Sequence, residues 1–347
     1  MSHAPTRTAE LRSVQYLRAV AALMVVAHHA RHYFPEGEGW TGVGSRGVDI
    51  FFVISGFVMA HSVARSNVLG PPHTRAAEFL RRRFVRVVPL YWLALLWTTK
   101  REWAAGHFGV DLGEDLVFWP HFHAVYRDGI YPALIPGWTI NYEMFFYVLF
   151  AVALLFGRAR RWLLPTVLVG LVVVGTTPLV GTGSSAPVLF YTHTVILEFA
   201  LGLAVHALWH RWPRLLPMPA AAVLSAVALG LLAVETSDRW RGVLDGLPAA
   251  LLVWSCLRWG ERLDSRLLQS LGDASYSIYL FHLASFAVSA WILNAFAVHQ
   301  PTAWNVASAI TLHLVVASIA GFLVYLAVER PLLRFLRQRT RGKRRSQ

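Results

Sequence analysis

The chain has 347 residues, of which 56% are hydrophobic and only 15% charged, and this composition excludes an ordinary soluble protein of its length. The formal net charge of +13 comes from 32 Lys and Arg residues. Nucleic-acid binding does not follow from it, because membrane proteins gather basic residues in cytoplasmic loops beside anionic lipid. The composition predicts an all-α polytopic membrane protein.

Hydropathy predicts about ten membrane-spanning helices. They are expected at residues 13–33, 48–64, 84–101, 138–157, 162–180, 187–208, 218–236, 243–258, 274–294 and 305–328. With a cytoplasmic N-terminus, the inner loops and both termini hold 24 of the 32 basic residues, and the outer loops and the outer end of the first helix hold seven. This asymmetry predicts that both termini are cytoplasmic. We expect one integral-membrane domain over 1–347, with a membrane core at about 13–331 and a basic cytoplasmic tail at 332–347.

The first span contains ionisable side chains, with Arg18 near its start and His28 and His29 near its end. Ionisable groups at membrane depth usually face a protein interior or an aqueous path, and so they mark function. Arg18 and His29 are eleven residues apart, almost three helical turns, so they share a face and lie about 16 Å apart along the axis. One face of this helix is therefore expected to carry a cation near one membrane surface and an imidazole toward the other.

The second span begins with the segment Gly47–Phe57, in which Asp49 precedes an apolar run. A carboxylate there either interacts with the helix dipole or orders a catalytic histidine, and the sequence favours neither reading. At the inner end of the third span, Arg83 and Arg86 share a face. Guanidinium groups suit bidentate phosphate contacts, although composition alone favours a role as membrane anchors.

The longest connection, about 102–137, is expected outside, and its length is typical of lids and binding segments. The next span carries Glu143 among aromatic residues that include Trp138 and Tyr142. Glu143 is expected about two turns deep, near the level of His29 and Asp49. A carboxylate in that setting favours a functional role.

The ninth span contains His282, for which a hydrogen-bonded position between helices is at least as well supported as a catalytic one. Cys256 is the single cysteine, so an intramolecular disulfide and a Cys-based zinc site are excluded. We expect no metal site and no permanently bound cofactor.

Together these motifs resemble those of the acyltransferase 3 family of bacterial membrane acyltransferases, over nearly the whole chain. The resemblance is carried by Leu17–Leu23 with His29, Gly47–Phe57, Arg83-x-x-Arg86-x-x-Pro89, Trp138 with Glu143, Ser275–His282 and Glu329-Arg-Pro331. The subtype looks most like the succinoglycan-type exopolysaccharide O-acetyltransferases. Asn141 and Tyr142 stand where many relatives have small residues, which fits that branch.

The resemblance implies the acyltransferase 3 fold and transfer of an acyl group, usually acetyl, from cytoplasmic acyl-CoA to a sugar hydroxyl. It implies that Arg83 and Arg86 dock the CoA phosphates and that Arg18 holds another anionic part of the donor. His29 is then the base or the transient acyl carrier, supported by Glu143 or, as the weaker candidate, Asp49. Further expected donor- or substrate-binding residues are Trp138, Tyr142 and His282.

The same resemblance implies a multi-pass protein of the bacterial cytoplasmic (inner) membrane. Its expected partners are the lipid bilayer, acyl-CoA, an exopolysaccharide or lipid-linked glycan acceptor, and the polysaccharide-biosynthesis machinery. Two alternatives remain open at this point. The acceptor could be a macrolide-type small molecule or a lipid, or the chain could be a non-enzymatic glycolipid transporter or flippase. The cytoplasmic arginine pair and the absence of an internal repeat favour the enzyme.

Overall fold

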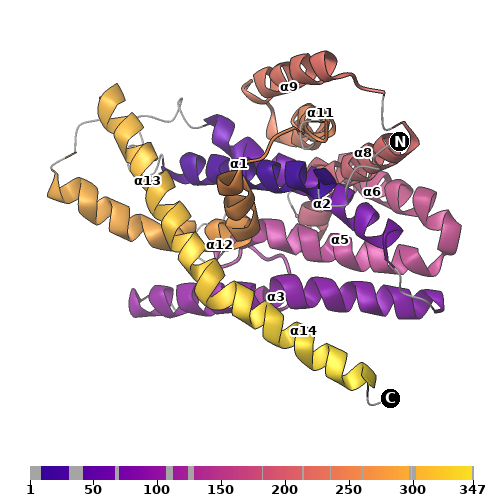
Figure 1. Cartoon of the computed structure of the whole chain (residues 1–347). Helices are drawn as coiled ribbons and strands as arrows, with labels where there is room; N and C mark the ends of the chain where they lie inside the picture. Colours follow the sequence, from indigo (N-terminus) through magenta and orange to yellow (C-terminus); the bar gives the residue numbers. More distant parts are fainter. Residues whose placement is uncertain are drawn as a thin grey trace. The chain divides into compact units, whose positions relative to one another are not determined.

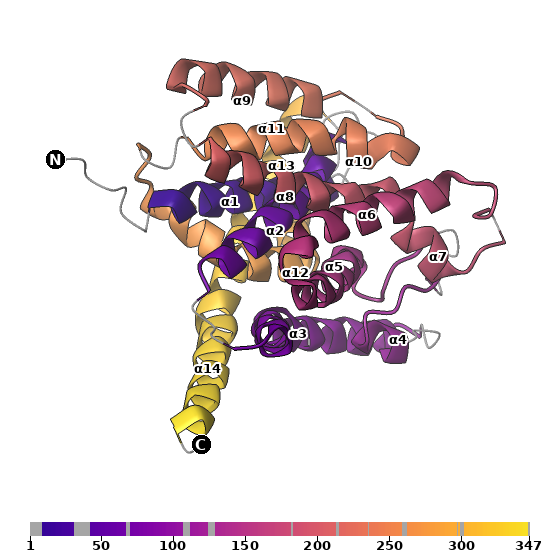
Figure 2. The same ribbon diagram turned by 90° about the vertical axis from the view of Figure 1, so that its right-hand side faces the viewer.

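Helices make up the regular structure of the residues described by the computed structural model, shown in Figures 1 and 2. The described residues are 9–30, 42–66, 70–106, 112–123, 129–181, 183–212, 215–234, 236–258, 262–296, 298 and 302–345. The outer end of the first expected span, 31–33, lies outside them. The helices divide into two compact units, each assembled from two stretches of the chain. Unit 1 holds Met1–His61 and Leu197–Leu323, and unit 2 holds Ser62–Ile196 and Val324–Gln347.

Five described helical segments are long and apolar enough to cross a membrane. They are Val43–Ala64, Ile135–Leu155, Gly157–Thr176, Arg266–Ala295 and Ala303–Leu336. A shorter apolar helix, Met218–Leu232, corresponds to another expected span. The chain is therefore a multi-pass membrane protein, and the all-α expectation is confirmed for the described residues, whereas the count of ten spans stays a prediction.

Unit 1 is built on the contact between the first helix of the chain and a long helix near its end. Its elements are α1 (Ala9–Ala30), η3 (Gly42–Arg46), α2 (Gly47–Ala64), α8 (Leu197–Arg211), α9 (Met218–Leu232), η7 (Asp238–Trp240), α10 (Arg241–Leu244), α11 (Gly246–Cys256), α12 (Arg266–Ala295) and α13 (Ala303–Val324). α1 packs along α12, and the backbone of Gln15 comes so close to Gly272 that a methyl group there would lie 2.2 Å from the Gln15 carbonyl oxygen. Small residues at such positions let helices in a membrane approach closely.

A second layer of unit 1 is the stack of α8, α11 and α9, which is visible in Figure 2. Buried apolar side chains from α1, α2, α8, α9 and α11 form one core cluster, in which Leu17, Ile54, Val205 and Val253 take part. Apolar residues therefore pack against α1 on several sides, and its residues Arg18, His28 and His29 are half-buried.

Unit 2 is built around two long helices. Its elements are α3 (Pro72–Ala104), α4 (Leu112–Leu116), η4 (Ile135–Gly137), α5 (Trp138–Leu155), η5 (Gly157–Ala159), α6 (Arg160–Thr176), α7 (Ala186–Tyr191), η6 (Thr194–Ile196), the π-helical turn Tyr325–Glu329 and α14 (Arg330–Arg345). α3 lies along α5 in both views, and α5 also packs on α6 (Figures 1 and 2).

The described part of the expected outer connection 102–137 is fastened within unit 2. The Asp115 carboxylate is fully buried and accepts the backbone N–H of Ala133 at 2.9 Å. The Trp92 indole donates to the carbonyl oxygen of Leu116 at 3.0 Å, and an isolated bridge joins Phe122 to Ile130. The Trp92 contact holds the connection against α3, and the other two contacts join the first and second halves of the connection.

Candidate functional site

In unit 1, α12 brings His282 against His29 of α1. The Nε2 atom of His282 lies 3.2 Å from Nδ1 of His29, and the ring centroids are 4.9 Å apart. The Nδ1 atom of His29 also lies 2.9 Å from the carbonyl oxygen of Val25. His282 is 1% exposed, and its Nδ1 lies 2.7 Å from the carbonyl oxygen of Tyr279. Two histidines that the sequence placed 253 positions apart thus form one pair.

The partners of this pair set the tautomers of both neutral rings. A carbonyl oxygen only accepts, so Nδ1 of His282 carries the proton and its Nε2 is an acceptor. The Nδ1 atom of His29 faces two acceptors, the Val25 carbonyl and Nε2 of His282, and therefore carries the proton of that ring. The basic lone pair of neutral His29 consequently lies on Nε2, which is the form that can take a proton from a hydroxyl.

The helix predicted around Arg18 and His29 is confirmed, since α1 runs unbroken from Ala9 to Ala30. Arg18 donates to Gln15 at 3.4 Å, and the Gln15 amide donates to Asp273 of α12 at 2.8 Å. Arg18 is therefore linked through Gln15 to the helix that carries His282. The contacts of Gln15 with Asp273 and of His29 with His282 also show that α1 and α12 run in the same direction.

Asp49 lies in the first turn of α2 and pairs with an arginine. Its side chain is fully buried, and it accepts from Nε and Nη2 of Arg241 in α10 at 2.9 and 3.0 Å. The same Nη2 donates to the Ser45 carbonyl oxygen at 3.2 Å. A bidentate guanidinium satisfies a buried carboxylate well. This geometry gives Asp49 a structural partner, and its proposed help to a histidine stays a prediction.

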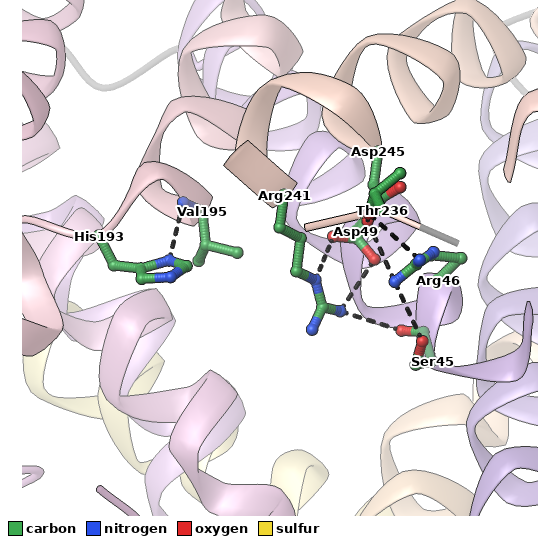
Figure 3. A network of polar contacts seen from close by, with 8 residues as sticks. All are labelled: Ser45, Arg46, Asp49, His193, Val195, Thr236, Arg241 and Asp245. Atoms are coloured by element: carbon green, nitrogen blue, oxygen red, sulfur yellow. Dashed lines mark hydrogen bonds and ion pairs between the residues drawn. The ribbon is translucent and has the colours of Figure 1, made fainter. Parts of the chain in front are cut away.

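A second ion pair lies beside the first in unit 1, as Figure 3 shows. Arg46 contacts Asp245 at 3.1 Å and donates to Thr236 at 3.2 Å, while Thr236 donates to Asp245 at 2.8 Å. Glu198, at the start of α8, is also fully buried and interacts electrostatically with Asp49. His193 of unit 2, which the figure also draws, accepts the Val195 N–H at 3.3 Å.

In unit 2, α5 carries the aromatic residues predicted around Glu143. Tyr147 donates its hydroxyl hydrogen to Glu143, one turn earlier on the same helix. Tyr142 stacks on Phe190 at a centroid distance of 3.9 Å and donates to its carbonyl oxygen at 2.6 Å, so this hydroxyl fastens α5 to α7. Trp138 meets Tyr142 edge to face at 5.9 Å. Glu143 and His29 belong to different units, and their cooperation stays a prediction.

A basic cavity of about 110 Å³ opens at the start of α3 in unit 2. Its lining combines arginines, one acid, small polar residues and apolar side chains: Ser62, Val63, Ser66, Arg75, Glu78, Phe79, Arg82, Arg83, Leu154 and Arg160. Arg83 lies 5.7 Å from the ring centroid of Phe79, and its Nε is buried without a hydrogen-bond partner. Glu78 accepts from Arg81 and Arg82, and these hydrogen bonds lower the pKa of its carboxyl to about 2.

Arg86 does not line this cavity but binds Glu329, which is 1% exposed. Glu329 ends the π-helical turn before α14, and the ion pair ties that turn to α3. The two arginines that the sequence treated alike therefore have different surroundings. Arg83 faces a space that could receive an anion, whereas Arg86 already has a carboxylate partner.

Sequence reasoning missed several charged residues of these sites. Arg75 and Arg160 counted only as basic residues of cytoplasmic loops, yet both line the cavity of Arg83. Arg46 and Arg241 were two of the seven basic residues assigned to outer loops. Their position against the positive-inside trend was a signal, because a basic residue on the outer side needs another reason to be there.

Comparisons with known proteins match nearly the whole chain, as the motif resemblance does. The sequence pattern of a family described as an acyltransferase domain matches residues 11–335. The exopolysaccharide production protein ExoZ of Rhizobium meliloti is 34% identical over 84% of this chain and 90% of its own length. The acyltransferase MdmB of Streptomyces mycarofaciens is 26% identical over 96% of this chain and 95% of its own.

A further match is the O-acetyltransferase OatA of Staphylococcus aureus, 24% identical over 77% of this chain and 49% of its own length. The shared part thus corresponds to about half of that protein. No solved structure matches the chain.

Proposed function

The chain belongs to this acyltransferase family and is an enzyme that transfers acyl groups, and we propose that it moves an acetyl group from acyl-CoA to a hydroxyl of an exopolysaccharide or lipid-linked glycan. Two relatives support this choice of acceptor and acyl group. The relative with 34% identity is named for exopolysaccharide production, and another is named an O-acetyltransferase.

The observation that carries the proposed chemistry is the His29–His282 pair, which puts the basic nitrogen of His29 on Nε2. In the proposed step, Nε2 takes the proton of the acceptor hydroxyl while the hydroxyl oxygen attacks the thioester carbonyl carbon. A carbon–oxygen bond forms, the carbon–sulfur bond breaks, and the CoA thiolate leaves with the proton from His29. His282 would position His29, because it accepts the Nδ1–H and so holds the reactive tautomer.

The basic cavity at the start of α3 supports a donor site for the CoA phosphates. Arg75, Arg82, Arg83 and Arg160 line it against the single acid Glu78, so its lining carries an excess of positive charge. Guanidinium groups bind phosphate through paired, charge-assisted hydrogen bonds. Arg83 is the central residue of this proposal, since its buried Nε lacks a hydrogen-bond partner.

We further propose ten spans with both termini in the cytoplasm, in the cytoplasmic membrane of a bacterium. The basic asymmetry supports this topology. Helix directions within unit 1 support it as well. Gly44 of η3 packs on Met24 and Gly47, the first residue of α2, packs on Ala21, so the chain enters α2 in the direction opposite to α1. α1 and α12, which correspond to the first and ninth expected spans, run in the same direction.

Acetyl transfer tests the proposed function directly. The full chain in lipid nanodiscs would receive isotopically labelled acetyl-CoA together with a purified exopolysaccharide repeat, and mass spectrometry would locate the label. Label on a sugar hydroxyl supports the proposal. Label retained on His29 without an acceptor would make this residue an acyl carrier, and no label on any sugar with the protein intact would contradict the proposed acceptor.

A further inference from the structure

Two glycines in unit 1 allow α2 and α8 to cross at very short range. A methyl group on Gly56 would lie 2.2 Å from the Phe199 carbonyl oxygen, and one on Gly202 would lie 2.1 Å from the Val53 carbonyl oxygen. No other residue type fits at this crossing without a shift of the backbones. The two helices run in the same direction and lie side by side in both general views (Figures 1 and 2).

This crossing brings three histidines together one to two turns further along. His61 follows Gly56 by five residues, and His206 and His210 follow Gly202 by four and eight. His206 and His210 are four apart, so they project from the same face of α8. Their ring centroids are 4.3 Å apart. The centroid of the His61 ring lies 5.8 Å from that of His206 and 6.0 Å from that of His210.

The nitrogens of the cluster converge as metal ligands do. One ring nitrogen from each of the three histidines lies within 4.8 Å of the other two. Nitrogen ligands lie about 2.0–2.1 Å from Zn²⁺, so small side-chain rotations bring all three into its coordination distance. Nε2 of His206 is buried without a hydrogen-bond partner. Imidazole suits zinc, copper and nickel, and three imidazoles leave one tetrahedral position for water.

The surroundings of the three histidines suit an ion that is bound firmly and reached from solvent. His61 is buried, His206 is half-buried and His210 is exposed, so an ion can enter from one side. Phe57 stacks on His61 with centroids 5.6 Å apart, and Trp209 lies 5.2 Å from His210. Apolar rings beside the ligands limit solvent access and restrict ring motion.

We propose that His61, His206 and His210 form a binding site for a divalent transition metal ion, for which Zn²⁺ is the probe, and that the bound ion clips α2 to α8. No metal site was predicted from the sequence. The three histidines are separated by as many as 149 positions, and the glycine crossing brings them together. The site is distinct from the His29–His282 pair and does not depend on the proposed acceptor. A ligand that binds only the folded chain stabilises it in proportion to its affinity and concentration.

The test uses the full chain purified in detergent through a tag without histidine. Calorimetric titration with Zn²⁺ should give one equivalent bound, together with a higher unfolding temperature. His206→Gln and His210→Gln should each weaken binding more than about 100-fold, since even residues that only support a ligand typically cost about 10–100-fold. His73→Gln, which changes an exposed histidine on α3, is the matched control and should bind like the unaltered chain.

A second measurement does not depend on the variants. X-ray absorption at the zinc edge of the unaltered, zinc-loaded chain counts the imidazoles that coordinate the ion. A shell with three imidazoles supports the site. A shell with fewer than three imidazoles, or equal binding by the chain and the His206→Gln and His210→Gln variants, overturns it.

Discussion

Nδ1 of His29 and Nε2 of His282 lie 3.2 Å apart, which joins the first helix of the chain to α12 through two side chains able to exchange one proton. The Val25 carbonyl shares the His29 N–H and fixes its direction. The arrangement separates Nδ1 of His29, which is held by hydrogen bonds, from Nε2, which is proposed to take the proton. It predicts unequal effects for substitutions of neighbouring histidines.

We expect His29→Ala to lower acetyl transfer by about 10²–10⁴-fold at normal expression, the usual cost of removing a general base. His28→Ala should have a mild effect, because this residue meets the His29 ring edge to face, at 5.2 Å between centroids, and is not part of the pair with His282. Product acetylation at matched protein levels measures both. Near-normal turnover in His29→Ala would remove this residue from the chemistry.

Substitutions of His282 should change activity through the tautomer of His29. His282→Gln keeps a group that can accept the His29 N–H, whereas His282→Leu leaves the Val25 carbonyl as its acceptor and removes one of the two contacts that fix the ring, worth about 0.5–1.5 kcal/mol. We therefore expect kcat to fall more in His282→Leu than in His282→Gln, with little change in KM for acetyl-CoA. Equal activity of the two variants would argue against a positioning role.

The donor cavity predicts different outcomes for two arginines of one helix. Arg83→Gln should raise KM for acetyl-CoA about 10-fold or more, since hydrogen bonds to charged groups are worth about 1.5–3 kcal/mol. Arg161→Gln, an exposed arginine beside the cavity residue Arg160, is the control and should leave KM unchanged. Arg86→Gln should act mainly on the unfolding temperature, because it leaves Glu329 buried without its cation.

The buried pair of Asp49 and Arg241 should be needed for stability. Removing one member of a buried ion pair typically costs about 3–5 kcal/mol, whereas exposed pairs contribute about 0–1 kcal/mol. Asp49→Ala should therefore lower the unfolding temperature of the detergent-solubilised chain far more than Asp264→Ala, which breaks the exposed pair with Arg12. Equal shifts in the two variants would contradict the buried geometry.

Glu78 should give the chain an acid-sensitive contribution to stability. Its carboxyl has a pKa of about 2 in the folded chain, chiefly through the hydrogen bond from Arg81, against an ordinary value of 4.5. A lowered pKa favours folding above the unfolded value, and the benefit disappears as pH falls from about 4.5 to about 2. Unfolding measured across this range should show a smaller pH dependence in Glu78→Gln than in the unaltered chain.

Reporter fusions test the proposed topology. Fusions after residues 113 and 184 should report the outside, and fusions after residues 73, 160 and 347 the inside, because of the distribution of basic residues. An outside signal at residue 160 would break the ten-span arrangement.

The sequence by itself determined what depends on local order. The unbroken α1 around Arg18 and His29 follows from a continuous apolar run and the period of the helix, and the family follows from motifs in a fixed order. The membrane setting follows from composition, which needs no knowledge of packing.

Only the tertiary structure decided which polar groups meet. The sequence placed Arg83 and Arg86 on one face, but the fold gives Arg86 the carboxylate of Glu329 and leaves Arg83 in a cavity with Arg75 and Arg160. The fold likewise pairs Asp49 with Arg241, and His29 with His282. The physical reason is that helix periodicity fixes the face on which a residue lies, whereas its partner is set by close helix crossings between segments that lie far apart in the chain.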